Sequence, residues 1–365
     1  MQADRFRQLL SAKGPYASVY FDDSHDTEDA AAQLDIKLRD LRRQLEEQGA
    51  DATVGDRLER AVRGSSPPVG KSGRAIVVGS EAVVFDETLV RPAPSPVVRV
   101  SDLPYVVPVV EYSYERPAFA VVAVDHAGAD IEVHHDGRVR KETVDGEGYP
   151  VHKASSAESP GYGDPQRSAE NARGKNVATV ADRVTALVDE LSPELVFVVG
   201  EVQSRSDLLA DLPERVADRS VEVNAGARTS IDEQQLHEAI SDQIERAHFA
   251  AVDDAADRFA AELGRGSGLA TEGLAGVTAA LRGGAVETLI IGDMGDATVV
   301  AGDDLATVSP NPDVLSQFGE APSQTLRADE ALPMVAISTG ASLVPAAARI
   351  TPADGVGAIL RYSVT

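Results

Sequence analysis

Residues 152–176 read HKASSAESPGYGDPQRSAENARGKN and carry the side chains of the chain best suited to contacting RNA. The stretch has no apolar period, and its four cations outnumber its three carboxylates in a chain of net charge −25. Lysine, arginine, asparagine and glutamine donate hydrogen bonds to phosphates, 2′-hydroxyls and base edges. The candidate RNA-binding residues are His152, Lys153, Gln166, Arg167, Asn171, Arg173 and Lys175.

The same stretch also fits an idle surface insertion. Loops longer than about 15 residues are uncommon in compact domains and are often functional. Several of the donors precede or begin a predicted helix, whose N-terminal amides favour an anion. The residues by themselves leave RNA contact and idle insertion both open.

Two acidic clusters suggest catalytic or metal chemistry instead. Oxygen and imidazole ligands for a divalent cation cluster in DDSHD (22–26), although a solvated loop before a helix explains this run as well. Asp125 and His126 form an acid–base pair after a predicted strand, but the chain has no G-x-S-x-G nucleophile motif. An RNase H-type nuclease at Asp125 requires further carboxylates that converge on two metals, and the sequence offers no convincing second and third.

The sequence supports neither a phosphate-binding loop nor a site formed by two neighbouring histidines. G-x-x-x-x-G-K-[ST] is not matched anywhere, and GRGSG (264–268) follows a predicted helix, as a helix terminator does. His134 and His135 are neighbours on a predicted strand and therefore face opposite sides of a sheet. We accordingly predict no catalytic residue, no metal site and no cofactor.

The composition describes an acidic, cysteine-free globular protein. Of the 365 residues, 43% are hydrophobic, only 4% are aromatic and none is cysteine, which excludes disulfides, thiolate metal sites and a cysteine nucleophile. A sequence pI near 4.6 opposes general attraction to nucleic acid, so any RNA contact must be local. The sequence contains neither a signal-peptide pattern nor about 18 consecutive apolar residues, so we expect no membrane partner. The acidic charge also argues against DNA as a partner, and the absence of cysteine is compatible with a cytoplasmic protein.

Alternating strand and helix patterns position the 152–176 stretch in an α/β unit. The apolar run at 118–125 predicts a central strand, and the alternation at 131–140 predicts a hairpin that turns at Asp136–Gly137. A helix is predicted from about Ser168 to Leu191, followed by a buried strand at 195–200. This order indicates a βα unit with a long insertion before its helix.

The flanking segments predict two further α/β domains. The first has a strand at 16–22, two helices, a strand pair over 74–89 and an extended proline-rich passage at 90–110. The last opens on a long helix with capping-box spacing at Ser230 and Glu233, continues with a helix over about 271–282 and has strands that include 285–293 and 333–338. A polar loop spans 309–324. The predicted domains are 1–116, 117–226 and 227–365.

This order of parts resembles the bacterial relatives of the archaeal and eukaryotic class-one peptide chain release factors and of Pelota. The likeness is carried by AFAVVAVD (118–125), ADIEVHHDGRV, VHK, the polar loop and RSAENARGKNVATVADRVTALVDEL, and by GVTAALRGGAVETLIIGD (276–293). The pattern is similar to the Balon-type ribosome hibernation factors and their actinobacterial branch. The resemblance implies three domains, with an RNase H-like α/β middle domain and an α/β/α C-terminal domain.

One departure from the release-factor pattern bears on the chemistry. Release factors hydrolyse peptidyl-tRNA with a Gly-Gly-Gln tripeptide at the tip of the middle-domain loop, and this chain has none. Its only adjacent glycines, Gly283 and Gly284, precede Ala285, whereas Gln166 follows Pro165, which fixes φ and lacks an amide proton. The resemblance therefore favours a factor that occupies the ribosome without hydrolysis.

The resemblance implies a translation factor that enters the A site of idle or stalled 70S ribosomes, with 152–176 directed toward the peptidyl transferase centre. Ribosomal RNA is the expected partner, and a translational GTPase such as elongation factor Tu is a further expected partner. Two alternatives stay open: a peptidyl-tRNA hydrolase or rescue factor that uses Gln166, and a stress-linked scaffold that binds only proteins.

Overall fold

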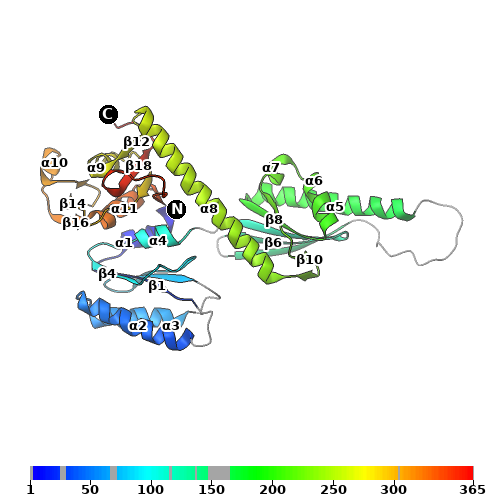
Figure 1. Cartoon of the computed structure of the whole chain (residues 1–365), viewed down its shortest axis with the longest axis horizontal. Helices are drawn as coiled ribbons and strands as arrows, with labels where there is room; N and C mark the ends of the chain where they lie inside the picture. Colours follow the sequence, from blue (N-terminus) through cyan, green and yellow to red (C-terminus); the bar gives the residue numbers. More distant parts are fainter. Residues whose placement is uncertain are drawn as a thin grey trace. The chain divides into compact units, whose positions relative to one another are not determined.

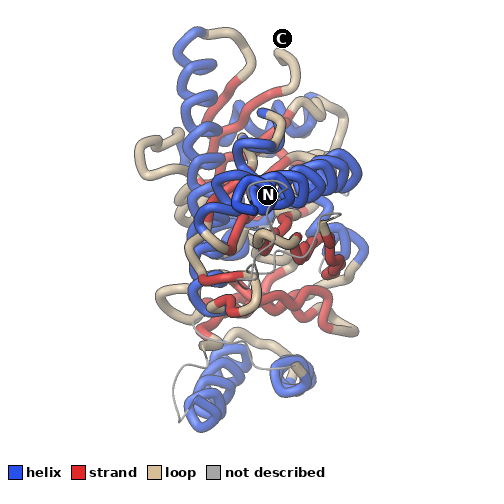
Figure 2. The backbone as a smooth tube through the Cα atoms, turned by 90° about the vertical axis from the view of Figure 1, so that its right-hand side faces the viewer, coloured by secondary structure: helices blue, strands red, loops and turns tan. Residues whose placement is uncertain are grey.

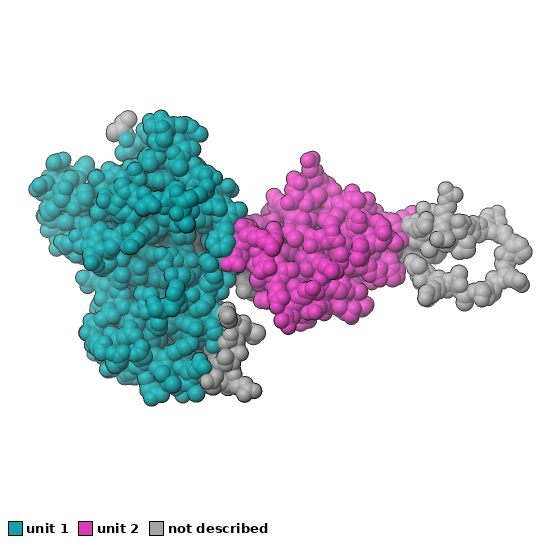
Figure 3. Space-filling model, viewed as in Figure 1, with its two compact units in different colours: residues 1–115, 248–365 teal, residues 116–247 magenta. Residues whose placement is uncertain are grey.

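The computed structural model describes residues 3–24, 30–65, 72–114, 117–135, 138–146, 165–302 and 305–364. The contacts divide the chain into two compact units (Figure 3). Residues 1–115 and 248–365 form unit 1, and residues 116–247 form unit 2. The predicted α/β fold class is confirmed, whereas the three-domain boundaries at 116 and 226 stay a prediction.

Unit 1 begins with a four-stranded antiparallel sheet of order β3-β2-β1-β4. Its strands are β1 (Tyr16–Asp22), β2 (Gly73–Val78), β3 (Val83–Leu89) and β4 (Val97–Ser101). The central strands β1 and β2 are almost wholly buried because both faces of the sheet are covered. The strand at 16–22 and the strand pair over 74–89 are thus confirmed.

Helices cover the two faces of this sheet. The pair α2 (Ala30–Glu47) and α3 (Ala52–Gly64) packs on one face through buried leucines of α2 and α3, and Figure 2 shows these helices as a layer beside the strands. On the opposite face lie η1 (Ala3–Phe6), α1 (Arg7–Ser11) and α4 (Val107–Tyr112). The extended passage predicted for 90–110 is wrong at its end, where Pro108 in the first turn of α4 is compatible with a helix.

The last third of the chain adds two small sheets to unit 1. The four-stranded sheet has the order β12-β18-β13-β17, and the three-stranded sheet has the order β15-β14-β16. Their strands are β12 (Ala270–Glu272), β13 (Val286–Ile291), β14 (Thr298–Ala301), β15 (Val308–Ser309), β16 (Gln324–Arg327), β17 (Ser342–Pro345) and β18 (Val356–Leu360). The helical elements are α8 (Glu233–Arg265), which begins in unit 2, α9 (Gly273–Arg282), α10 (Pro312–Gln317), α11 (Ala328–Ser338) and η2 (Ala353–Gly355).

Three expectations for this part are wrong. The segment 333–338 belongs to the helix α11, not to a strand, because a helix buried on all sides has the same continuous apolar pattern as a buried strand. The loop at 309–324 contains α10, which Asn311 caps by accepting the Val314 N–H at 3.1 Å. The cap of α8 is Asp232 rather than Ser230, since the Asp232 carboxylate accepts the Gln235 N–H at 3.0 Å.

Unit 2 contains a mixed sheet with helices packed on it (Figure 1). The sheet has five strands in the order β7-β6-β5-β8-β9. Its strands are β5 (Phe119–Val124), β6 (Gly128–His135), β7 (Arg138–Asp145), β8 (Leu195–Gly200) and β9 (Ser220–Glu222). The helices are α5 (Pro165–Leu191), α6 (Val202–Asp211) and α7 (Glu214–Ala217), and a small hairpin pairs β10 (Gly226–Ala227) with β11 (Ser230–Ile231). The hairpin, the strand at 195–200 and the long helix are confirmed, and the turn predicted at Asp136–Gly137 lies outside the described residues.

The core of unit 2 lies between its sheet and α5. Val177, Val180, Val184 and Leu187 recur at helical spacing and are at most 2% exposed. They pack on Ala120, Val122, Val196 and Val198 of the central parallel strands. The position of α5 relative to the sheet is therefore set by its apolar stripe.

Candidate nucleic-acid interface

The candidate interface begins where the central strands of unit 2 end. Strands β5 and β8 are parallel neighbours, so Asp125, His126 and Glu201 follow them at the same edge of the sheet. This carboxyl edge is where open α/β sheets usually bind ligands. Gly200 has φ of +133°, and a Cβ there would lie 1.9 Å from the carbonyl oxygen of Val124, so only glycine lets the two strands end side by side.

Asp125 stabilises the β5–β6 turn. Its Oδ1 accepts the N–H groups of Ala127 at 2.8 Å and Gly128 at 2.9 Å, and its own N–H donates to the Gly128 carbonyl at 3.0 Å. This is the local side-chain turn that aspartate forms readily. A carboxylate occupied in this way is poorly placed to act as the base of a hydrolase or nuclease.

Arg228 extends this turn into a larger network. Its guanidinium binds Asp130 through two hydrogen bonds of 2.8 and 2.9 Å and Asp125 through one of 3.2 Å. Because Arg228 donates to Asp130, the pKa of that carboxyl is held below its ordinary value. The network joins the β10–β11 hairpin, which contains Arg228 in its loop, to β5, β6 and their turn.

Gly146, which precedes residues 147–164, and Asn176, in the helix that follows them, both bind the β5–β6 turn. The Gly146 N–H donates to the Ala127 carbonyl at 2.9 Å, and the Asn176 amide donates to the His126 carbonyl at 2.9 Å. Asn176 is 2% exposed, and a Cβ on Gly146 would lie 2.1 Å from its Oδ1. The end of β7 and the fourth turn of α5 are therefore held at the carboxyl edge of the sheet.

The predicted RNA-binding residues have different outcomes. His152 and Lys153 lie outside the described residues, and Gln166, Arg167 and Asn171 belong to α5 although their side chains lie outside the described part. Helix α5 begins at Pro165, three residues before the predicted start, so more than a third of the 152–176 stretch is helical. Two of the seven predicted side chains are described, those of Arg173 and Lys175.

These two cations differ in their surroundings. Arg173 forms an ion pair with Asp207 of α6, and its hydrogen bond holds the pKa of that carboxyl below the ordinary value. Lys175 is exposed, and no carboxylate of the described residues pairs with it. To bind a phosphate, Arg173 would have to exchange Asp207 for it, whereas Lys175 has no described carboxylate to leave.

Most other described cations of unit 2 are already paired with carboxylates. Arg183 binds Glu142 with hydrogen bonds of 2.5 and 2.7 Å, and Arg205, which is 5% exposed, binds Glu222 at 2.9 Å. Pairs on the surface include Arg140–Glu190, Lys141–Glu132 and Arg215–Asp189. Pairing leaves few positive groups to attract nucleic acid outside the 152–176 stretch, which agrees with a small RNA footprint.

The other candidate chemistries gain no support from the described residues. Within those residues, no three His, Cys, Asp or Glu side chains converge to hold a metal ion, and His25 and Asp26 of DDSHD lie outside them. His134 stacks on Phe119 with ring centroids 4.3 Å apart, as a structural histidine does. Among the described helices, none combines the length and apolar character needed to cross a bilayer.

Sequence reasoning missed three residues that build this edge. Asn176 is the last residue of the polar stretch, where a buried role has no sequence signal. Gly146 resembles any loop glycine, and Arg228 sits among small residues in NAGARTS (224–230), which reads as a linker. The sequence did contain one hint about Arg228. An arginine in a short segment of small residues has no carboxylate nearby in sequence, so its partner must come from a distant part of the chain.

Comparison with known proteins gives one family and several relatives. Residues 118–265 match the model of bacterial archaeo-eukaryotic release factor family 2. Two Mycobacterium tuberculosis proteins, Uncharacterized protein Rv2629 and Uncharacterized protein MT2704, are each 49% identical over 366 residues, which covers 100% of this chain and 98% of theirs.

Solved structures of low sequence identity were also found. A model of ribosome-bound archaeal Pelota and ABCE1 has 15% identity, covers 100% of this chain and 95% of that chain, and has a TM-score of 0.43. The crystal structure of Archaeoglobus fulgidus Pelota has 14% identity, coverage of 100% and 93%, and a TM-score of 0.40. The archaeal translation termination factor aRF1 has 16% identity, coverage of 99% and 97%, and a TM-score of 0.27.

Proposed function

Because the chain belongs to the bacterial archaeo-eukaryotic release factor family, we propose that it is a non-catalytic factor that occupies the A site of idle or stalled ribosomes. The family is one of translation factors related to Pelota and the archaeal release factors. The finer assignment, a hibernation or stress-protection role, rests on a cation-bearing stretch in unit 2 that lacks the release tripeptide. That pairing of features is the observation that supports the proposal most directly.

The glycines of this chain support a role without hydrolysis. Its only adjacent pair, Gly283 and Gly284, ends α9: Gly284 has φ of +62°, and the Ala285 N–H donates to the Ala280 carbonyl at 3.0 Å. This is a left-handed helix stop in unit 1 and leaves no glycine pair for a catalytic loop. Gln166, the other candidate for hydrolysis, lies in the first turn of α5.

The proposed RNA contacts concentrate at the start of α5. Lys153, Arg167, Arg173 and Lys175 would neutralise phosphates of ribosomal RNA near the peptidyl transferase centre, with His152, Gln166 and Asn171 adding hydrogen bonds. Asn176, in the fourth turn of α5, donates to the His126 carbonyl at the sheet edge, and we propose that the contacts are made from the turns that precede it. Ribosome association then places the protein in the cytoplasm, with a translational GTPase as a further proposed partner.

Cosedimentation with vacant 70S ribosomes tests this proposal. The wild-type protein should pellet with ribosomes at moderate salt, and replacing Lys153, Arg167, Arg173 and Lys175 with alanine should weaken binding and flatten its dependence on salt. Each lost phosphate contact should lower the slope of log K against log salt by about 0.7–0.9. Because Arg173 must first leave Asp207, its single substitution should weaken binding less than that of Lys175.

A matched control keeps the same net charge. It replaces four exposed arginines that pair with carboxylates elsewhere, namely Arg215, Arg258, Arg265 and Arg349. This variant should bind ribosomes as the wild type does. Protein that stays in the supernatant with vacant ribosomes would overturn the proposal, and peptide release from peptidyl-tRNA above the buffer rate would overturn its non-catalytic part.

A further inference from the structure

Within unit 2, an ion pair joins α5 to α6. Arg173 of α5 donates through Nη2 to Oδ2 of Asp207, and the two side chains are 31% and 35% exposed. Within the described part of the chain, this is the only hydrogen bond of the Arg173 guanidinium. Because arginine carries several N–H donors in a fixed plane, the others stay available to a further anion.

The Asp207 carboxylate accepts a second hydrogen bond from its own helix. The Gln203 Nε2 group donates to Oδ1 of Asp207 at 2.8 Å, and Gln203 lies one turn earlier on α6. The hydrogen bond from Arg173 holds the pKa of Asp207 below its ordinary value, so this carboxyl is charged at neutral pH. Two donors from two helices thus converge on one anion.

Packing between α5 and α6 keeps these donors in place. Leu208, which follows Asp207, is 0% exposed and lies in the same core as Val177 and Val180 of α5. The two helices contact each other and lie side by side in Figure 1. A site built on packed helices holds its donors more precisely than a site on a loop.

The Arg173–Asp207 pair is weak enough to be exchanged. It is partly exposed and has one hydrogen bond, whereas Arg183 and Glu142 are joined by two of 2.5 and 2.7 Å. Exposed ion pairs contribute little because water and salt screen them. A phosphate can accept two N–H groups of an arginine at once. A phosphate that reaches Arg173 can therefore compete with the carboxylate.

We propose that Arg173 and Gln203 form a two-donor site for a phosphate of RNA and that Asp207 occupies this site in the free protein. The carboxylate stands in for the phosphate, so RNA that binds here must release Asp207 to solvent. Asp207 is then an internal competitor that lowers the affinity of unit 2 for RNA, whereas Lys175 has no such competitor among the described residues. This inference rests on the proposed function, because it assumes that RNA reaches the turns of α5 before Asn176.

Substitution of Asp207 tests the competition. Asp207→Asn keeps the shape of the side chain and removes its charge. Binding is measured to vacant 70S ribosomes by cosedimentation and to a fluorescent oligouridylate by anisotropy at low salt. The variant should bind both about threefold to fivefold more tightly than the wild type, as the loss of an exposed ion pair allows. Asp207→Ser, which removes the charge with a different shape, should give the same gain.

A matched control separates competition from net charge. Asp189→Asn also removes one charge and frees an arginine, Arg215, whose side chain is 56% exposed. It should change the affinity for either RNA less than about twofold, because screened charges act only over short distances.

The gain must also depend on the two donors. In the Asp207→Asn background, Arg173→Gln should abolish the gain, and Gln203→Ala should lower the affinity about threefold through the lost hydrogen bond. Circular dichroism confirms that each variant is folded. The site is wrong if Asp207→Asn and Asp207→Ser bind oligouridylate no better than Asp189→Asn, or if the gain survives Arg173→Gln. Because oligouridylate binding needs no ribosome, a wild-type protein that fails to pellet overturns the proposed function and not this comparison.

Discussion

Substitution of Arg228 by methionine should loosen the carboxyl edge of unit 2. Methionine keeps much of the side-chain volume but removes the hydrogen bonds of 2.8 and 2.9 Å to Asp130 and of 3.2 Å to Asp125. Unit charges about 4 Å apart attract by ~4 kcal/mol at an effective dielectric constant near 20. Desolvation of Arg228 opposes this attraction, and because the Asp130 side chain is 49% exposed, solvent screens it further. The free energy of local opening at this edge should therefore fall by about 2 kcal/mol, between the values for surface and buried ion pairs.

Hydrogen exchange measured by mass spectrometry gives the assay for this loss. Peptides that cover the β5–β6 turn and the β10–β11 hairpin should exchange about 30-fold faster in Arg228→Met, as a 2 kcal/mol change in local opening requires. The matched control is Arg215→Met, which removes a pair with Asp189 whose side chains are 56% and 54% exposed. It should change exchange less than about fivefold, since such surface pairs contribute at most ~1 kcal/mol.

The pH dependence of the loss has a defined sign. Arg228 lowers the pKa of Asp130 in the folded protein, so the stabilisation is present above the unfolded aspartate pKa of about 3.9 and is lost as the pH falls below it. The difference between wild type and Arg228→Met should therefore be constant from pH 8 to about pH 5 and should shrink in acid. If Arg228→Met exchanges like Arg215→Met at pH 7, the network does not hold the turn and the reasoning is wrong.

Three further predictions concern the cores of the two units. Burial raises the pKa of Glu330 above the ordinary glutamate value. The folded state therefore binds the proton more tightly than the unfolded state, and the stability that this contributes at low pH is lost as the pH rises through the raised pKa. Because glutamine does not titrate, the melting temperature of Glu330→Gln should fall less than that of the wild type between pH 4 and 8. Gly200→Ala should destabilise unit 2 by at least ~3 kcal/mol in urea titration because its Cβ would meet the Val124 carbonyl at 1.9 Å, whereas Gly64→Ala, with no neighbour within 4 Å, should be neutral or stabilising. Leu187→Ala should lower the free energy of unfolding of unit 2 by about 2–5 kcal/mol, and a loss below 1 kcal/mol would contradict the packing of α5 on the sheet.

The sequence predicted those elements whose signal is local. The strands at 118–125 and 195–200 are nearly continuous apolar runs, the strand at 16–22 is mostly apolar, and α5 has a one-sided apolar stripe. The continuous apolar pattern of 333–338 is compatible with a buried strand and with a buried helix. Only its packing within unit 1, where this segment of α11 is buried on almost all sides, determines that it is a helix. Propensity cannot supply that information, because tertiary packing determines it.

For the candidate interface, too, local features could be predicted and distant contacts could not. The cations of 152–176 could be recognised by type, but the partner of Arg173 could not, since Asp207 lies 34 residues away on another helix. Asn176 and Arg228 act through contacts 50 and about 100 residues distant. Contacts between residues so far apart depend on the folded arrangement of strands, which no short motif encodes.

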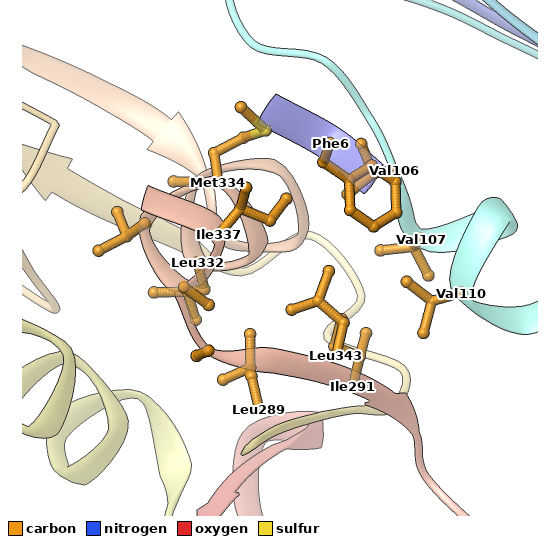
Figure 4. Packing of buried hydrophobic residues seen from close by; sticks show 14 of the residues in the cluster. Phe6, Val106, Val107, Val110, Leu289, Ile291, Leu332, Met334, Ile337 and Leu343 are labelled. Atoms are coloured by element: carbon orange, nitrogen blue, oxygen red, sulfur yellow. The ribbon is translucent and has the colours of Figure 1, made fainter. Parts of the chain in front are cut away.

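Figure 4 shows side chains of the first segment (1–115) and the last segment (248–365) packed into one core of unit 1. This shared core has a consequence for how the protein is made. Residues 116–247 must be synthesised after the first segment and before the last, and at 5–20 residues per second this takes roughly 7–26 s. During that interval the apolar side chains of η1, α1 and α4 have no partner from α11 or β17 and stay open to solvent or to a chaperone. Unit 2, contiguous in the chain, can fold while it emerges. Unit 2 can therefore be folded before unit 1 is complete.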